Sequence, residues 1–193
     1  RCEEALALAA KALANADGQT AAKIAPIDSE IDQMERTIES LCLKLLLQQQ
    51  PVARDLRQIS AALKMITDME RIGDQASDIA EIIGFLNGRI GTDAQYICQM
   101  AVAAMRMVTE SVEAYVKRDV AMAEATIQHD DVVDDLFLKV KESLIQMISE
   151  NPKDGEYALD LLMIAKYFER IGDHATNIAE WVVFSVTGVH EQG

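Results

Sequence analysis

The chain of 193 residues is poor in the residue types that interrupt helices or favour strands. It contains three prolines and nine glycines, and aromatic side chains make up only 5% of it. The three cysteines have no CxxC spacing, so nothing indicates a zinc site or a disulfide framework. No apolar run is long enough to cross a bilayer. With alanine, leucine, isoleucine, methionine and glutamate abundant, the sequence predicts a soluble, intracellular, all-α protein.

Positive charge is also scarce, because 18 lysines and arginines face 32 acids for a net charge of −14. A nucleic-acid-binding surface needs clustered basic residues, and anionic lipids attract basic segments. The charge therefore argues against nucleic acid as a partner and against direct membrane insertion or adhesion. Any membrane association is expected to run through a protein partner.

One segment occurs twice. The sequence ERIGDQASDIAE at Glu70 to Glu81 returns as ERIGDHATNIAE at Glu169 to Glu180, with nine of twelve positions identical. Acids upstream of this segment also match between the two copies. The matched positions are 99 residues apart from Asp55 onward and 102 residues apart before it. Internal repetition of this kind indicates two copies of one structural unit.

Six helices are predicted from the apolar periodicity and the turn signals. Short connections between long helices force antiparallel neighbours, so the expected fold is all-α with two pseudo-symmetric three-helix bundles, over residues 1–88 and 91–188. Pro26 should kink the second helix or mark its start. The first helix is about ten residues shorter than its counterpart, which suggests a trimmed amino terminus. The predicted helices cover residues 1–16, from the Asp17-Gly18 turn to about 50, 52–86, 92–117, 120–150 and 154–187.

Acidic residues follow one face of each repeated segment. Acids one helical turn apart lie in one stripe, and such like-charged pairs cost a few tenths of a kcal/mol each on a helix. A bound cation would explain why this cost recurs at matched positions: oxygen ligands suit Mg, Ca or Mn, and carboxylates on facing helices can bridge iron or zinc. A solvated acidic face is the alternative. The stripes contain Glu70, Asp74, Asp78 and Glu81 in the first copy, Glu169, Asp173, Asn177 and Glu180 in the second, and the pairs Asp28–Asp32 and Asp130–Asp134 upstream.

Taken together, the doubled ERIGDxAxxIAE segment, QQPVARDLR at Gln49 to Arg57 and the acidic pairs at Asp28 and Asp130 resemble the PhoU family of phosphate-uptake regulators over essentially the whole chain. The resemblance implies two three-helix bundles whose acidic motifs bind metal ions, such as iron, zinc, manganese or magnesium, singly or as multinuclear clusters. The implied metal ligands are Asp28, Asp32, Glu70, Asp74, Asp130, Asp134, Glu169 and Asp173, with Asp78 and Asn177 as weaker candidates.

The resemblance also implies a regulatory rather than catalytic role, with no catalytic residues. The expected partners are the ATP-binding subunit of the phosphate-specific ABC transporter and the phosphate-sensing histidine kinase, whose starvation response such proteins help to repress. It implies a cytoplasmic location, peripheral to the inner face of the membrane through these partners, and leaves a homodimer open.

Two other functions are compatible with the residues. A ferritin-like carboxylate-bridged metalloenzyme would need Glu-x-x-His pairs on facing helices, and the sequence has none. A metal-free helical adaptor differs from the regulator only in metal content. The histidines at 129, 174 and 190 are interpreted as solvated or helix-face residues rather than ligands.

Overall fold

The computed structural model describes residues 1–86, 88–89 and 94–189, and this part of the chain is helical almost throughout and contains no strand. The predicted all-α fold of two pseudo-symmetric three-helix bundles is confirmed. The first half contains α1 (Cys2–Asn15), α2 (Gly18–Ala21), α3 (Ile24–Gln48) and α4 (Ala53–Phe85), and the second contains α5 (Gln95–Lys117), α6 (Val120–Gln128), α7 (Asp130–Glu150), a 3-10 turn (Pro152–Asp154) and α8 (Gly155–Thr187).

Two of the six predicted helices are interrupted. The second is divided into α2 and α3 by Ala22 and Lys23, and the fifth is divided into α6 and α7 at His129. Pro26 accounts for the first break, because it has no N–H to donate to the carbonyl of Ala22 and is tolerated only in the first turn of a helix. Asn87 and Thr92, where two boundaries were predicted, lie outside the described residues.

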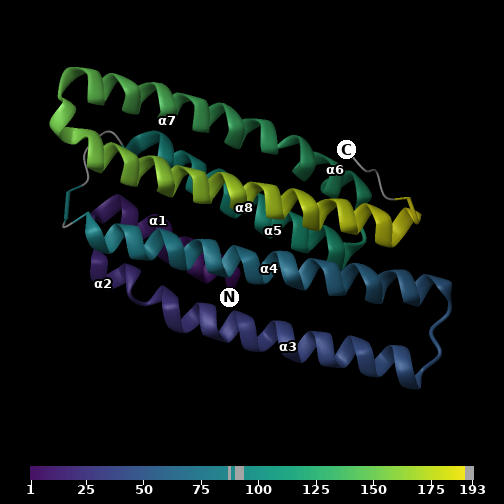
Figure 1. The fold of residues 1–193 in the computed structure, drawn as a ribbon. Coiled ribbons are helices and arrows are strands. Elements are labelled where there is room, and N and C mark those ends of the chain that lie inside the picture. The colour runs from purple at the N-terminus through teal and green to yellow at the C-terminus, as the bar shows by residue number, and fades with distance from the viewer. Residues whose placement is uncertain (87, 90–93, 190–193) are drawn as a thin grey trace.

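Four long helices lie side by side in the order α3, α4, α8, α7, and α1 and α5 pack on one face of this row (Figure 1). α4 and α8 are antiparallel and form the largest contact between the two halves. They are also the two helices that carry the repeated segment. The repeat therefore places both copies of the segment in the centre of the molecule.

The pseudo-symmetry extends to the helix caps. α1 ends at Ala16 and α5 ends at Arg118, and both residues adopt the left-handed conformation, with φ of 52° and 56°. The next residue in each half is an aspartate whose side chain accepts a hydrogen bond from a backbone N–H of the following helix: Asp17 from Gln19, and Asp119 from Met122. These caps confirm the offset of 102 that the sequence predicts for this region.

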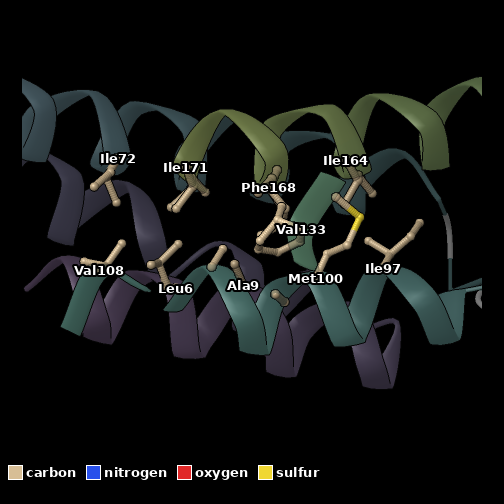
Figure 2. Packing of buried hydrophobic residues seen from close by; sticks show 14 of the residues in the cluster. Leu6, Ala9, Ile72, Ile97, Met100, Val108, Val133, Ile164, Phe168 and Ile171 are labelled. Carbon is tan, nitrogen blue, oxygen red and sulfur yellow. The ribbon is translucent and has the colours of Figure 1, made fainter. Parts of the chain in front are cut away.

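The core is a single apolar cluster that runs through both halves. Leu6 and Ala9 of α1 lie close to Val108 of α5, while Phe168 and Ile171 of α8 close the layer above them (Figure 2). Full burial of each large apolar side chain stabilises the fold by about 1.5–3 kcal/mol. Within the described residues, no helix combines the length and the apolar character that a membrane span requires.

Candidate metal centres

The first acidic cluster lies where the start of α3 meets the middle of α4. Asp28 and Asp32 are one turn apart on α3 and face Asp74 of α4. One carboxylate oxygen from each of these residues lies within 4.8 Å of the others. Three carboxylates at this separation are spaced to share one cation or a small cluster of cations.

Gly73 makes this close approach possible. A Cβ atom at Gly73 would lie 2.7 Å from Oδ1 of Asp28 and 3.0 Å from Cδ1 of Ile31. Any side chain at position 73 would therefore displace the carboxylate of Asp28. The glycine of the ERIGD segment is therefore a packing requirement of the cluster.

The negative charge of the first cluster is compensated only in part. Oδ1 of Asp28 is buried and accepts no hydrogen bond. Burial, followed by the charges of Asp74 and Asp32, raises the pKa of Asp28 above its ordinary value. Burial and the charge of Asp74 likewise raise the pKa of Glu70, one turn earlier on α4. The cation nearest to the cluster is Arg71, whose Nη1 lies 3.1 Å from Oδ2 of Asp74.

The second cluster repeats the arrangement between α7 and α8. A Cβ atom at Gly172 would lie 3.1 Å from Oδ1 of Asp130, and this oxygen too is buried without a hydrogen-bond partner. Burial, then the charges of Asp134, Asp173 and Glu169, raise the pKa of Asp130 to about 6. A carboxyl group whose pKa is raised by neighbouring acids marks a site where further negative charge is unfavourable. A bound cation would stabilise the ionised carboxylates there.

The two clusters differ in detail. Burial, followed by the charge of Glu169, raises the pKa of both Asp134 and Asp173. Lys166 forms an ion pair with Glu169, one turn along α8. Among the described residues, only the first cluster brings three ligand atoms within 4.8 Å of one another. The first cluster is therefore the tighter of the two, and the second carries a lysine where it could compete with a cation.

The two weaker candidates, Asp78 and Asn177, point toward the contact between α4 and α8. Asn177 donates from Nδ2 to Oδ1 of Asp68 at 3.2 Å, and Asp78 accepts a hydrogen bond from Tyr167. Asp68 and Tyr167 are themselves matched at the offset of 99, so the two bonds are pseudo-symmetry mates. Asp78 still adds to the negative charge around Asp28, whereas the structure places Asn177 against the other half.

Sequence patterns did not identify the partners of the histidines. Nδ1 of His174 lies 2.8 Å from Oδ1 of Asp68, and Nδ1 of His129 lies 3.1 Å from Oε2 of Glu110. Both histidines are thus held by acids rather than simply solvated, while residue 190 lies outside the described residues. Asp68 and His174 are 106 residues apart, so no local pattern links them.

The arrangement as a whole fits metal ions. Each half offers carboxylate oxygens from two facing helices, with one buried oxygen that no protein donor satisfies. Hard cations such as Mg, Mn and Ca, and iron, accept all-oxygen ligand sets, whereas the softer ligands that zinc and copper favour come from cysteine and histidine. The three cysteines, Cys2, Cys42 and Cys98, are free thiols.

Comparison with known proteins gives a consistent result. The PhoU domain family matches residues 1–83 and 97–182. A "phosphate-specific transport system accessory protein PhoU homolog" of Clostridium acetobutylicum is 37% identical, over 92% of this chain and 82% of that protein. A protein of the same description from Pseudomonas aeruginosa is 35% identical, over 93% of this chain and 75% of that protein.

Solved structures agree with the sequence comparisons. The crystal structure of PhoU from Pseudomonas aeruginosa has a TM-score of 0.93 and 34% identity, covering 97% of this chain and 91% of that one. The phosphate transport system regulatory protein PhoU from Streptococcus pneumoniae has a TM-score of 0.89 and 25% identity, covering 99% and 90%. From the repeated acidic segments, the two matched bundles and these comparisons, the chain belongs to the PhoU family.

Proposed function

We propose that this chain is a metal-binding accessory regulator of a phosphate-specific transport system. The observation that carries the metal-binding part is the buried, unpartnered Oδ1 of Asp28 and of Asp130, each facing further carboxylates across a helix pair. The transport part is supported by the relatives, which are named as accessory proteins of such a system. Those names also favour a non-enzymatic role.

In this proposal the metal adds positive charge to that of Arg71 and Lys166, which pair with acids of the two clusters. Asp28, Asp32, Glu70 and Asp74 would hold it in the first half, and Asp130, Asp134, Glu169 and Asp173 in the second. Because the ligands come from α3 and α4, or from α7 and α8, binding fixes the relative positions of the two helices. A ligand that binds only the folded protein at 100 times its Kd stabilises it by about 2.7 kcal/mol.

The consequence for regulation is a helical surface whose geometry depends on metal. We propose that this surface contacts the ATP-binding subunit of the phosphate-specific ABC transporter and the phosphate-sensing histidine kinase at the cytoplasmic face of the membrane. Through these contacts the chain would lower transport and repress the starvation response when phosphate is plentiful. The boundaries of the two bundles, at residues 88 and 91, remain a prediction.

Elemental analysis of the purified protein tests the metal sites. Protein prepared without chelator or metal-affinity resin should contain metal, and the double variant Asp74→Ala, Asp173→Ala should lose most of it while keeping its helical content. The control variant Glu39→Ala, Glu142→Ala removes the same charge from exposed positions of α3 and α7 and should keep its metal. Equal metal content in all three proteins would place the metal elsewhere.

Binding to purified partners tests the regulatory part separately. The wild-type chain should retain the ATP-binding subunit on an affinity column more strongly with metal than after chelation, and the cluster variant should not respond to metal. If metal is bound at the clusters but leaves partner binding unchanged, the ions are structural and the regulatory proposal fails. If metal-free protein binds both partners at full strength, the chain is an adaptor.

A further inference from the structure

Two helices of the second half expose large aliphatic side chains. Leu138 and Ile145 of α7 are 53% and 61% exposed, and Leu159 and Met163 of α8 are 58% and 44% exposed. Large apolar side chains that form one exposed patch mark a site of interaction, whereas scattered ones do not. We name these four residues the α7–α8 face.

The α7–α8 face continues the two stripes of acids that form the second cluster. Its α7 residues follow Asp134 by four and eleven positions, and its α8 residues precede Asp173 by ten and fourteen. These intervals are close to whole numbers of helical turns. α7 and α8 are antiparallel neighbours (Figure 1), so both stripes run from the cluster toward the turn at Pro152–Asp154. The four side chains therefore form one patch between the cluster and this turn.

The first half does not repeat this face. Three of the four matched positions hold polar residues there, although the two halves share their fold and their acidic clusters. The requirements of the common fold therefore do not explain the apolar residues of α7 and α8. At the offsets of 102 and 99, the matched pairs are Arg36 with Leu138, Leu43 with Ile145, Ser60 with Leu159 and Lys64 with Met163.

Three cations lie on the same two stripes, and two of them are already engaged. Lys166 pairs with Glu169, and the guanidinium of Arg170 lies 5.8 Å from the centre of the Tyr167 ring. Lys141 is exposed between the two α7 residues of the face. In the part of the chain that the structure describes, it pairs with no acid. A ligand of the face therefore meets an apolar surface with one unpaired cation in it, which a carboxylate would complement.

A second copy of the chain and a lipid surface fit these charges poorly. Two-fold pairing of the face would bring Lys141 and Lys166 of both copies close together, and the net charge of −14 adds to the repulsion. An anionic lipid surface would meet the second cluster at one end of the face and the exposed Glu142 and Glu156 near the other. A helix of another protein can place a single carboxylate at Lys141 and keep the rest of the contact apolar.

We propose that the α7–α8 face binds an amphipathic helix of a partner protein, with a carboxylate of that helix opposite Lys141. Packed helices lie about 8–10 Å apart, so a helix seated between α7 and α8 contacts both stripes through apolar side chains at i, i+4 and i+7. The inference rests on the proposed function, because it locates the surface that contacts the transporter subunit or the kinase. Metal held by Asp134 and Asp173 would fix the two helices that form this surface.

The affinity of the full chain for the purified ATP-binding subunit and for the purified kinase tests the face. The double variant Ile145→Ser, Leu159→Ser removes apolar contacts without a change of charge and should weaken binding of at least one partner by about tenfold or more. The control Leu43→Ser, Leu56→Ser removes two exposed leucines of the first half and should bind like wild type. All four side chains are about half exposed or more, so each variant should keep its thermal midpoint within about 3 °C of wild type.

Single substitutions test the carboxylate and the role of the second cluster. Lys141→Glu should weaken binding about tenfold, whereas Lys139→Glu, on the opposite side of the same helix, should leave it unchanged. Asp173→Ala should remove the effect of added metal on partner binding, whereas Asp74→Ala should retain it. Unchanged affinity in Lys141→Glu would overturn the assignment of the carboxylate.

The outcomes separate this inference from the proposed function. If the double variant binds both partners as tightly as wild type does, the face is not the contact surface, although the regulatory proposal stands. If wild type binds neither partner, both proposals fail. A wild-type dimer that Ile145→Ser, Leu159→Ser converts to monomer would assign the face to a second copy. Binding to phosphatidylglycerol vesicles that the same variant abolishes would assign it to lipid, and either result would overturn the inference.

Discussion

Replacing Asp130 with asparagine should stabilise the metal-free protein and at the same time weaken its response to metal. Asp130 has a buried oxygen without a hydrogen-bond partner, and its pKa is raised to about 6 by burial and by neighbouring acids. Asparagine keeps the shape of the side chain but has no charge to bury. Its amide can donate to the surrounding carboxylates. The substitution therefore removes the electrostatic cost and one metal ligand together.

The magnitude follows from the pKa. A rise from the ordinary 3.8 to about 6 corresponds to about 3 kcal/mol at 1.36 kcal/mol per unit. Because Asp130 is only partly buried, solvent screening reduces this to about 1–2 kcal/mol. The folded state binds more protons than the unfolded state between pH 4 and 6, so the free energy of unfolding falls as pH rises through that window and stays lower above it.

The assay is urea unfolding followed by circular dichroism, in chelator, from pH 4.5 to 7.5. At pH 7 metal-free Asp130→Asn should be more stable than wild type by about 1–2 kcal/mol, or about 3–6 °C in thermal midpoint, and its pH dependence should be weaker. Acids such as Asp134 and Asp173, whose pKa values are also raised, will keep part of the dependence. Added metal should raise the free energy of unfolding of the wild type more than that of the variant. The difference in stability between the two proteins should therefore narrow or change sign.

Asp131→Asn is the control, because it removes the same charge from the neighbouring, exposed position. It should leave the metal response, and the pH dependence of the free energy of unfolding, nearly unchanged. The reasoning is refuted if metal-free Asp130→Asn is less stable than wild type at pH 7. It is also refuted if its stability depends on pH as steeply as that of wild type.

Three further predictions concern other parts of the structure. Gly73→Ala should fold but lose metal from the first cluster, measured by elemental analysis, since its Cβ would lie 2.7 Å from Oδ1 of Asp28; retention of full metal content would contradict this. Phe168→Ala should lower the free energy of unfolding by about 3–5 kcal/mol, measured in urea, because the ring is fully buried. Asp68→Ala removes the hydrogen-bond partner of His174 across the contact of α4 and α8. It should lower the free energy of unfolding by about 1–3 kcal/mol. A loss below about 0.5 kcal/mol in the same assay would show that this hydrogen bond contributes little to stability.

Much of the fold could be predicted because its determinants are local. Pro51 and the Asn151-Pro152 pair separate long runs with helical periodicity, and α4 and α8 begin and end close to the predicted positions. Asp17 and Asp119 match at the offset of 102 and cap equivalent helices. Interruptions within a run were harder to predict, since His129 ends α6 without a proline or glycine nearby.

The candidate site, like the fold, could be predicted from the sequence only in part. A spacing of four residues places Asp28 and Asp32 on one face of a helix, and the duplication points to the same face of the other half. Spacing alone does not show which helix that face meets. The structure brings Asp74 to this pair but turns Asn177 toward Asp68, although both belong to the same repeated stripe of acids.

The sequence by itself determined the helical class, the duplication and the four-residue spacing of the acids, because each depends on residues that are neighbours along the chain. Only the tertiary structure decided which acids converge and which oxygen atoms are buried without a donor. Those properties depend on how α3, α4, α7 and α8 cross, and helix packing joins residues as far apart as Asp68 and His174. Periodicity identifies the face that a helix buries, while packing alone selects its neighbour.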